Sequence, residues 1–556
     1  MPEGDADTVL LRYLRDGEAR TVEASLETRA DGEDWWRAEL PLRNPVVPYR
    51  WVLAGGRGGY RWLNSTGAYP HEVAPGDDFR LVAAPGGPAW HLSSVGYEIF
   101  IDRFAPSAAD RPPPDWAVPR DWGGLPELPW PDANRELFGG DLRGIEQHLD
   151  HVESLGANAI WLTPFFPAPS NHHYDPTSYD RVDPLVGGDE AFASLVCAAR
   201  ARQLRLIGDL LLDHCGSQHE WFVRAQADAA SPERTLYLFD RLEAQGFASW
   251  RGSDVLPRFD WDSDELRSRM QTVVQDWLQR GLDGWRIGSA GAVGRHRSAD
   301  LNADVARWLR GAAGDGLVVG EFWNDFRPDV DGLGWHGVMN YAGFMRPVWW
   351  WLRGDALGDG TFDVFTAAPA PTYAGGQATA VMQAFRASVP WEVTLHSWLL
   401  LDSHDTPRFR TVCGSRERQL VGVGLQMSMP GVPMVFAGAE LGLEGASGHD
   451  ARRTIDWDAP EGWDDSLLRE YRRLIALRRS SDALACGGLR YLHVADDAIA
   501  YLRESRTDRV LCLAARAPHD PIPAPFSGLT TLYGDDPADG LLPSHGPAFH
   551  AWRIDA

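Results

Sequence analysis

Short apolar segments of this sequence end repeatedly in acidic, histidine or arginine residues. The runs that show this are 209–214 (Asp-Leu-Leu-Leu-Asp-His), 284–288 (Gly-Trp-Arg-Ile-Gly), 319–323 (Val-Gly-Glu-Phe-Trp) and 402–405 (Asp-Ser-His-Asp). Any one of these residues alone is about equally well explained as an ion-pair partner or a strand cap. As a set they point to chemistry, because carboxylates beside arginine and histidine are the groups used in general acid–base and nucleophilic catalysis.

These segments belong to a regular alternation of apolar runs and amphipathic helical stretches, which is typical of a parallel βα fold. We expect eight strands, at 97–101, 159–163, 204–211, 284–287, 317–320, 337–340, 398–401 and 432–436. Eight strands close a (β/α)₈ TIM barrel, in which active sites lie at the carboxyl ends of the strands. The polar residues are therefore predicted to meet on one rim.

The regions around these strands differ in pattern. Residues 1–92 alternate apolar and polar positions between turn signals, which predicts an N-terminal β-sandwich of the kind found in carbohydrate-binding modules. We assign 93–482 to the barrel, with a long loop at 213–269 after the third strand, and loops of that length tend to be functional. The alternation returns in 483–556 and predicts a C-terminal β-sandwich. The expected fold class is therefore α/β, with two flanking β domains.

The composition excludes several functions. The 44% hydrophobic and 24% charged residues are ordinary for a globular protein, and no apolar run reaches the ~20 residues that span a bilayer. A net charge of −25 disfavours nucleic acid as a partner. All 53 basic residues are arginine, which rules out Schiff-base lysine chemistry and a P-loop lysine.

Cysteine and tryptophan usage adds two expectations. The five scattered cysteines show no metal-ligand or redox spacing, and the acidic N-terminus lacks a secretory pattern, so we expect a soluble cytoplasmic protein. Most of the 25 tryptophans are expected to fill cores, but flat rings also stack on sugar faces. The tryptophan content is therefore weak support for a carbohydrate ligand.

Three further motifs carry a family resemblance. In chain order they are 97–104 (Tyr-Glu-Ile-Phe-Ile-Asp-Arg-Phe), 138–142 (Phe-Gly-Gly-Asp-Leu) and 168–175 (Ala-Pro-Ser-Asn-His-His-Tyr-Asp). Together with the strand ends, they resemble glycoside hydrolase family 13, the α-amylase family, and most closely its cyclomaltodextrinase, neopullulanase and maltogenic amylase branch. The resemblance runs from about residue 10 to 480.

The resemblance implies a role for each matching residue. Glu321 would be the general acid/base, Asp405 would hold the sugar 2- and 3-hydroxyls, and position 288 would carry the nucleophile. The implied sugar contacts are Tyr174 by stacking, His214, Arg286 and His404 by hydrogen bonds, Trp323 on the leaving-group side, and Asp450 with Arg452 or Arg453 as a clamp. Asp209 and Asp213 would be structural, and Asp213 replaces the usual Asn, which leaves a local calcium or hydrogen-bond role open. No cofactor and no other metal is indicated.

The chemistry of retaining cleavage agrees with these roles. One carboxyl group attacks the anomeric carbon while another protonates the leaving oxygen, with the two ~5–5.5 Å apart. The apolar Phe322 and Trp323 beside Glu321 suit a proton donor, and Arg286 would keep a neighbouring nucleophile ionised.

The nucleophile itself is missing from this sequence. The family pattern Gly-x-Arg-x-Asp is here Gly284-x-Arg286-x-Gly288. Glycine forms no covalent glycosyl-enzyme, and neither neighbour replaces it, because Asp283 lies at the strand's start and Ser289 should face the opposite way. We expect an impaired hydrolase, with a space at position 288 that a small anion could fill.

Several alternatives stay open. The chain is either an enzyme changed at this one position, to trap a substrate or to act as a glycosynthase, or a natural glucan-binding pseudo-enzyme. We favour the first, because the other site residues are present. A glucosyl-transferring isomerase is a nearer alternative. The expected substrates are maltooligosaccharides or cyclodextrins with α-1,4 or also α-1,6 bonds, and the resemblance favours a homodimer.

Overall fold

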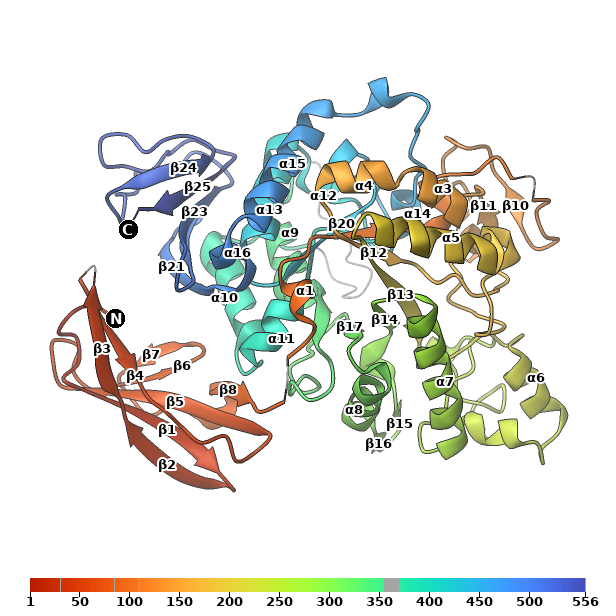
Figure 1. Cartoon of the computed structure of the whole chain (residues 1–556), viewed down its shortest axis with the longest axis horizontal. Helices are drawn as coiled ribbons and strands as arrows, with labels where there is room; N and C mark the ends of the chain where they lie inside the picture. Colours follow the sequence, from red (N-terminus) through yellow and green to blue (C-terminus); the bar gives the residue numbers. More distant parts are fainter. Residues whose placement is uncertain (31, 85, 110, 130, 355–369, 556) are drawn as a thin grey trace.

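The computed structural model describes residues 1–556 except 31, 85, 110, 130, 355–369 and 556. Eight parallel strands form a closed barrel at its centre (Figure 1). In chain order they are β9 (Gly96–Ile99), β12 (Ala159–Leu162), β13 (Arg205–Leu211), β14 (Gly284–Gly288), β17 (Leu317–Phe322), β18 (Gly337–Asn340), β19 (Trp398–Leu400) and β20 (Val432–Phe436). β20 pairs in parallel with β9 and closes the ring. The predicted barrel is confirmed, and each strand overlaps its expected range.

The strands are apolar along most of their length because both of their faces are covered. All four residues of β12 and all six of β17 are buried, as expected for parallel strands with helices outside and side chains inside the barrel. The helices around the barrel are α3 (Leu142–Gln147), α4 (Leu149–Leu155), α5 (Gly188–Ala201), α7 (Asp264–Arg280), α8 (Asn302–Ala313), α9 (Arg346–Leu352), α10 (Gly375–Arg386), α11 (Trp391–His396), α12 (Phe409–Cys413), α13 (Arg416–Ser428) and α15 (Asp465–Arg479).

Helix α7 shows how local sequence sets these boundaries. The Ser263 side chain accepts a hydrogen bond from the Leu266 N–H, and Asp264 and Glu265 occupy the first turn. Arg280 lies in the last turn, and Gly281 follows with φ 130°. An N-cap serine, early acids and a late base all favour a helix. The last six residues of the predicted 213–269 loop are therefore helical.

The rest of that insertion after β13 has its own small core. It contains α6 (Glu220–Ala227), and the Phe222 ring packs against Tyr237 and Phe247 with ring centroids 4.8 and 4.9 Å apart. Tyr237 stacks on Phe259 at 5.4 Å. These aromatic contacts hold a long connection in a defined shape beside the rim.

The N-terminal region is an antiparallel sheet with a hairpin packed against it. The sheet order is β2 (Glu18–Glu23), β1 (Thr8–Arg15), β5 (Val46–Ala54), β6 (Arg61–Asn64) and β7 (Gly67–Tyr69), and β8 (Phe79–Val82) also pairs with β5. β3 (Ser25–Ala30) and β4 (Glu33–Arg37) form the hairpin. Val9, Leu11 and Tyr13 are buried while their neighbours in β1 are not, which is the alternation seen in the sequence.

The C-terminal region is a single five-stranded antiparallel sheet within the described residues. Its order is β21 (Gly488–Val494), β22 (Ala498–Glu504), β23 (Arg509–Ala515), β25 (Ala548–Ile554) and β24 (Leu529–Tyr533). One face, with Tyr501 and Phe549, joins the core of the barrel. Ile522 and Leu542, from the β23–β24 and β24–β25 connections, cover the other face where a second sheet would lie.

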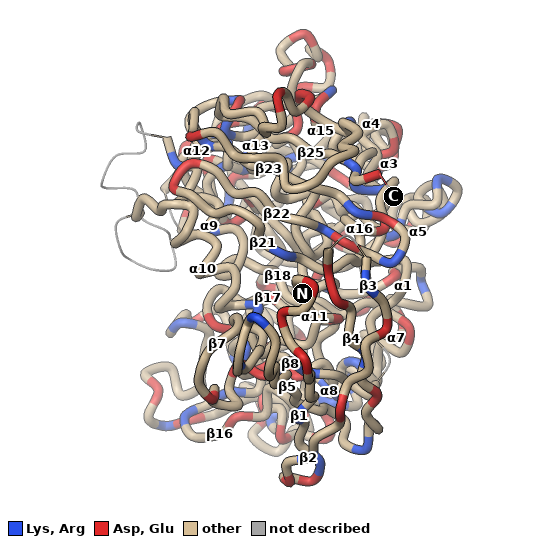
Figure 2. The backbone as a smooth tube through the Cα atoms, turned by 90° about the vertical axis from the view of Figure 1, so that its left-hand side faces the viewer, with Lys and Arg blue, Asp and Glu red and all other residues tan. Residues whose placement is uncertain are grey.

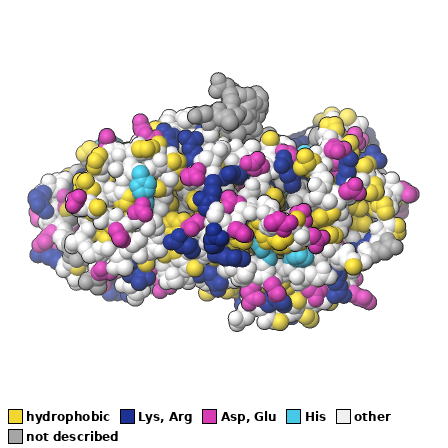
Figure 3. Space-filling model, turned by 90° about the horizontal axis from the view of Figure 1, so that it is seen from above, with side chains coloured by type: hydrophobic (Ala, Val, Ile, Leu, Met, Phe, Trp, Pro, Cys, Tyr) yellow, Lys and Arg dark blue, Asp and Glu magenta, His cyan; other side chains and the backbone are white. Residues whose placement is uncertain are grey.

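Both flanking sheets lie on the same side of the barrel (Figure 1). Arg490 of β21 pairs with Glu33 of β4 at 2.5 Å, which links the C-terminal sheet to the N-terminal hairpin. Acidic and basic residues are interspersed along the backbone (Figure 2) and over the face seen from above (Figure 3). None of the helices in the described part of the chain is long and apolar enough to cross a membrane.

Candidate active site

The strand ends bring Arg286, Asp209 and Glu321 together at one rim of the barrel. Arg286 of β14 lies 3.1 Å from the Asp209 carboxylate on β13 and 2.5 Å from the Glu321 carboxylate on β17. All three side chains are buried. Because adjacent strands carry them, the guanidinium bridges two acids that are far apart in the sequence. The sequence predicted this meeting.

Asp209 is the most enclosed carboxylate of the site. Besides Arg286, it accepts hydrogen bonds from the Tyr174 hydroxyl at 2.9 Å and from the Trp161 indole at 3.2 Å. Burial raises the pKa of Asp209 to about 6, against the lowering effect of Arg286. Asp209 was predicted to be structural, and its contacts show that it positions the arginine and the tyrosine.

His404 and Asp405, after β19, form a charged pair at the same rim. His404 Nδ1 contacts Glu98 at 2.6 Å, and its Nε2 lies 3.2 Å from Asp405 and 2.9 Å from the Tyr174 hydroxyl. Burial alone would lower the pKa of His404, but Asp405 and Glu98 raise it to about 9. The ring is therefore an imidazolium at neutral pH, with both nitrogens donating.

Asp405 is held ionised and partly open to solvent. Burial alone would raise its pKa, but the His404 charge and the Arg452 guanidinium hold the pKa of Asp405 well below its usual range. Its side chain keeps 28% of its surface exposed, whereas His404 is fully buried. Asp405 can therefore reach a ligand while His404 supports it from behind.

The structure divides the predicted clamp into two pairs. Arg452 lies 3.1 Å from Asp405 and donates to the His404 carbonyl at 2.7 Å, so it belongs to the site. Asp450 instead pairs with Arg453 at 2.7 Å and accepts from the Ala446 N–H. Of the two arginines left open by the sequence, Arg452 holds the site acid and Arg453 holds Asp450.

Glu321 projects from the end of β17 with both oxygens engaged. One contacts Arg286, and the other accepts the Ser289 N–H at 2.5 Å. Two residues further along, Trp323 stacks on Tyr341 with ring centroids 3.8 Å apart and planes 12° apart. The general-acid candidate is thus flanked by a pair of stacked aromatic rings, as expected from Trp323.

Asp213 and His214 follow β13 and are both buried. His214 Nδ1 lies 3.3 Å from Asp213, whose other oxygen receives the Arg258 guanidinium at 2.6 Å. Burial would raise the pKa of Asp213, but His214 and Arg258 lower it. These donors occupy the oxygens that a calcium ion would need, so the residues here do not fit a calcium site.

Position 288 lies inside this cluster. A Cβ atom built on Gly288 would lie 2.6 Å from Leu211 Cδ2 and 3.0 Å from Arg286 Nη1. The expectation of open space is therefore wrong at the Cβ position, because the tip of Leu211 already fills it. The Leu211 side chain is flexible, so a larger residue at 288 is accommodated when Leu211 changes rotamer.

The predicted orientation of Ser289 rested on strand alternation, which does not extend that far. β14 ends at Gly288, and Ser289 adopts a left-handed backbone with φ 51°. Its hydroxyl accepts the Trp250 indole N–H at 3.1 Å. Ser289 is thus occupied by the insertion after β13, and it offers Glu321 only its backbone.

Sequence reasoning assigned no role to Glu98, Leu211, Trp250 or Tyr341. Two of these could have been found from the sequence. Glu98 lies in the 97–104 motif, and Tyr341 directly follows a predicted strand. Trp250, whose ring packs 5.6 Å from His214, comes from the long insertion and had none.

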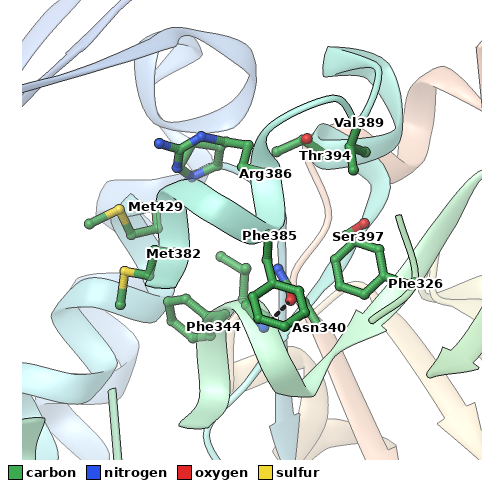
Figure 4. A pocket seen from close by; sticks show the side chains of 13 residues that line it. Phe326, Asn340, Phe344, Met382, Phe385, Arg386, Val389, Thr394, Ser397 and Met429 are labelled. Atoms are coloured by element: carbon green, nitrogen blue, oxygen red, sulfur yellow. Dashed lines mark hydrogen bonds between the residues drawn. The ribbon is translucent and has the colours of Figure 1, made fainter. Parts of the chain in front are cut away.

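A small, partly open cavity beside β18 is too small for a sugar. It measures about 30 Å³ and is lined by Phe326, Asn340, Phe385 and Met382 among others (Figure 4). The Asn340 side chain accepts the Gly343 N–H at 2.9 Å. Ligand sites are typically ~300–1,000 Å³, so this cavity does not compete with the rim.

Comparison with known proteins agrees with this geometry. The family described as "Alpha amylase, catalytic domain" matches residues 98–338. The chain is similar to a cyclomaltodextrinase of Geobacillus thermopakistaniensis, with 30% identity over 500 residues that cover 87% of this chain and 79% of the relative. It is also similar to neopullulanase 2 of Thermoactinomyces vulgaris, with 28% identity over 493 residues, 84% of this chain and 77% of the relative.

A solved structure shows the same architecture. The cyclic α-maltosyl-(1→6)-maltose hydrolase of Arthrobacter globiformis, in complex with that cyclic sugar, matches with a TM-score of 0.68 and 29% identity. The match covers 79% of this chain and 94% of that chain.

Proposed function

This chain belongs to the α-amylase family of glycoside hydrolases, and on that premise we propose that it binds α-1,4-linked glucan chains at the barrel rim while cleaving them negligibly. The names of its relatives, a cyclomaltodextrinase and a neopullulanase, support linear and cyclic maltooligosaccharides as ligands. The cyclic maltosyl-maltose hydrolase supports ligands that also contain α-1,6 bonds.

The observation that carries the proposal is a cluster of polar side chains, suited to sugar hydroxyls, around a position without a side chain. Tyr174, Arg286 and His404 surround Asp209, and Asp405 is ionised and partly exposed beside them. Gly288 lies between Arg286 and Leu211. The chain therefore has groups that can bind sugar hydroxyls, but no side chain at position 288 that could form a covalent bond to the sugar.

The missing step follows from the retaining mechanism. Glu321 would protonate the leaving oxygen, and a carboxylate at 288 would attack the anomeric carbon from the opposite side. Asp209 does not replace that carboxylate, because its side chain is fully buried and holds three donors. With no nucleophile, the bound sugar stays intact.

The test is Gly288→Asp, with Gly288→Asn as a matched control of similar size that cannot act as a nucleophile. Titration of the unaltered chain with maltotetraose is expected to show binding, with the sugar uncut overnight. Gly288→Asp should raise turnover of maltotriose, cyclodextrin or pullulan by about 10³-fold or more, because a restored nucleophile lowers the barrier by several kcal/mol. Gly288→Asn should give no gain.

Two outcomes would contradict the proposal. Rapid cleavage by the unaltered chain would remove position 288 from the mechanism. Binding by all three proteins without turnover in Gly288→Asp would favour a glucan-binding protein whose site is inert for other reasons, and the contact between Leu211 and position 288 is the observation that favours it. Trehalose or isomaltose among the Gly288→Asp products would instead indicate a glucosyl-transferring isomerase.

A further inference from the structure

A groove separate from the catalytic cluster opens on the same face of the barrel. It has a volume of about 510 Å³ and is walled by three segments, 111–116, 167–185 and Gln218. These segments follow β9, β12 and β13, which are neighbours in the barrel. Since all three connections leave the carboxyl ends of their strands, the groove lies on the catalytic rim.

The walls of the groove are rigid and offer one broad aromatic surface. Five prolines line it, at 112, 114, 167, 169 and 184, together with the half-buried ring of Trp116. Proline fixes the backbone, so the groove is preformed and loses little entropy when a ligand binds. In the described part of the chain the Trp116 indole N–H makes no hydrogen bond, so it can donate to a ligand.

The polar groups of the groove are paired within the protein. Arg111 is salt-bridged to Asp141. Asp183 contacts His173 at 3.1 Å. Gln218 is exposed and uncharged. Arg111 is thus neutralised, and the Asp183 carboxylate is buried and hydrogen-bonded to His173 and the Leu185 N–H. The groove therefore favours a neutral ligand that combines a flat apolar face with hydroxyl groups, over a phosphate or a cation.

One segment of the chain connects the groove with the catalytic site. His173, the partner of Asp183, directly precedes Tyr174, whose hydroxyl contacts Asp209 and His404. The 167–185 segment thus contributes to the groove and to the catalytic site.

We propose that this groove is a second binding site for an α-glucan segment, with Trp116 stacking on a glucose ring and Gln218 bonding its hydroxyls. The inference rests on the proposed function, because it takes its ligand from there. Its volume lies in the range of small-molecule sites. The site concentrates long chains at the rim without taking part in cleavage.

Calorimetric titration with maltoheptaose tests the groove in the unaltered chain, where the ligand is expected to survive the experiment. Two binding events per chain are expected. Trp116→Ala should remove one of them or weaken it by about tenfold or more, and Tyr174→Ala should affect the other. Gln218→Ala, an exposed change that does not disturb folding, should weaken the same event as Trp116→Ala.

Two variants serve as controls. Trp116→Tyr keeps a flat ring and should restore most of the affinity. Leu125→Ala changes an exposed residue of the same proline-rich region that does not line the groove, and should have no effect.

The inference and the proposed function fail in different ways. If Trp116→Ala and Gln218→Ala bind as the unaltered chain does while Tyr174→Ala abolishes binding, the groove binds no glucan and the proposed function stands. If the unaltered chain binds no maltoheptaose, both are overturned.

Discussion

Lowering the pH from 7.5 to 5 is expected to destabilise the barrel through three buried histidines at the rim opposite the active site. His91 lies in helix α1 (Ala89–Leu92), just before the first barrel strand. His336 immediately precedes β18, and His396 ends α11, just before β19. Trp398 donates to His91 Nε2 at 3.0 Å, so the His91 proton lies on Nδ1 and is donated to His396 Nδ1 at 2.9 Å. His336 Nδ1 accepts the Val318 N–H at 3.0 Å.

Burial, with the nearby Arg310 charge, lowers the pKa of His336 to about 3 and that of His396 to about 4. The unfolded chain binds these protons near pH 6.5, so protonation favours the unfolded state and stability is lost as the pH falls below 6.5. At pH 5 each histidine then costs about 2 kcal/mol relative to pH 7.5, or about 4 kcal/mol for the two together. His91 acts in the same direction, because burial also lowers its pKa.

The assay is urea unfolding at pH 7.5 and 5.0 for the unaltered chain and for His336→Asn. The asparagine oxygen can accept the Val318 N–H but does not titrate, so the loss of stability on acidification should shrink by about 2 kcal/mol. His71→Asn, at an exposed histidine, is the control and should leave the loss unchanged. An unchanged loss in His336→Asn would refute the reasoning, because His336 would then contribute nothing to the pH dependence.

Two predictions concern the rim in a Gly288→Asp background. Glu321→Gln should abolish cleavage of maltooligosaccharides but reduce cleavage of glucosyl fluorides less, because a good leaving group needs less protonation. Equal losses of rate on both substrates would argue against Glu321 as the acid. Gly288→Asp itself should lower the free energy of unfolding by about 1–3 kcal/mol, because the new side chain contacts Leu211. Adding Leu211→Val should recover part of this loss in thermal unfolding. If it recovers none, the loss does not come from the contact with Leu211.

The barrel could be predicted because its strands and its active rim follow local rules. Buried parallel strands read as continuous apolar runs, and β12 and β17 are of this kind. In a closed barrel of parallel strands, the carboxyl ends of all the strands meet at one rim. Arg286, Glu321 and His404, which lie within or after such strands, can therefore be assigned to one rim from the order of residues alone.

Pairings between side chains could not be predicted, because they depend on which loops meet. From the sequence, either Arg452 or Arg453 could pair with Asp450. In the structure Arg453 pairs with Asp450, because of the backbone path at 447–451. Arg452 instead contacts Asp405, 47 residues away. Glu98 supports His404 across 306 residues. Ser289 was misjudged for a related reason, since alternation holds only while the strand continues.

The proposed absence of a nucleophile at position 288 also bears on Arg286 and, through it, on Glu321. The family resemblance implies an acid at position 288 beside this arginine, but here the Arg286 charge is shared between Asp209 and Glu321. The group expected to protonate the leaving oxygen is therefore held by the arginine that should serve the nucleophile. An aspartate at 288 would give Arg286 another acceptor close to Nη1, the nitrogen that donates to Asp209, whereas Glu321 contacts Nη2. In the Gly288→Asp variant, the new carboxylate and Glu321 are therefore expected to contact different nitrogens of the same guanidinium.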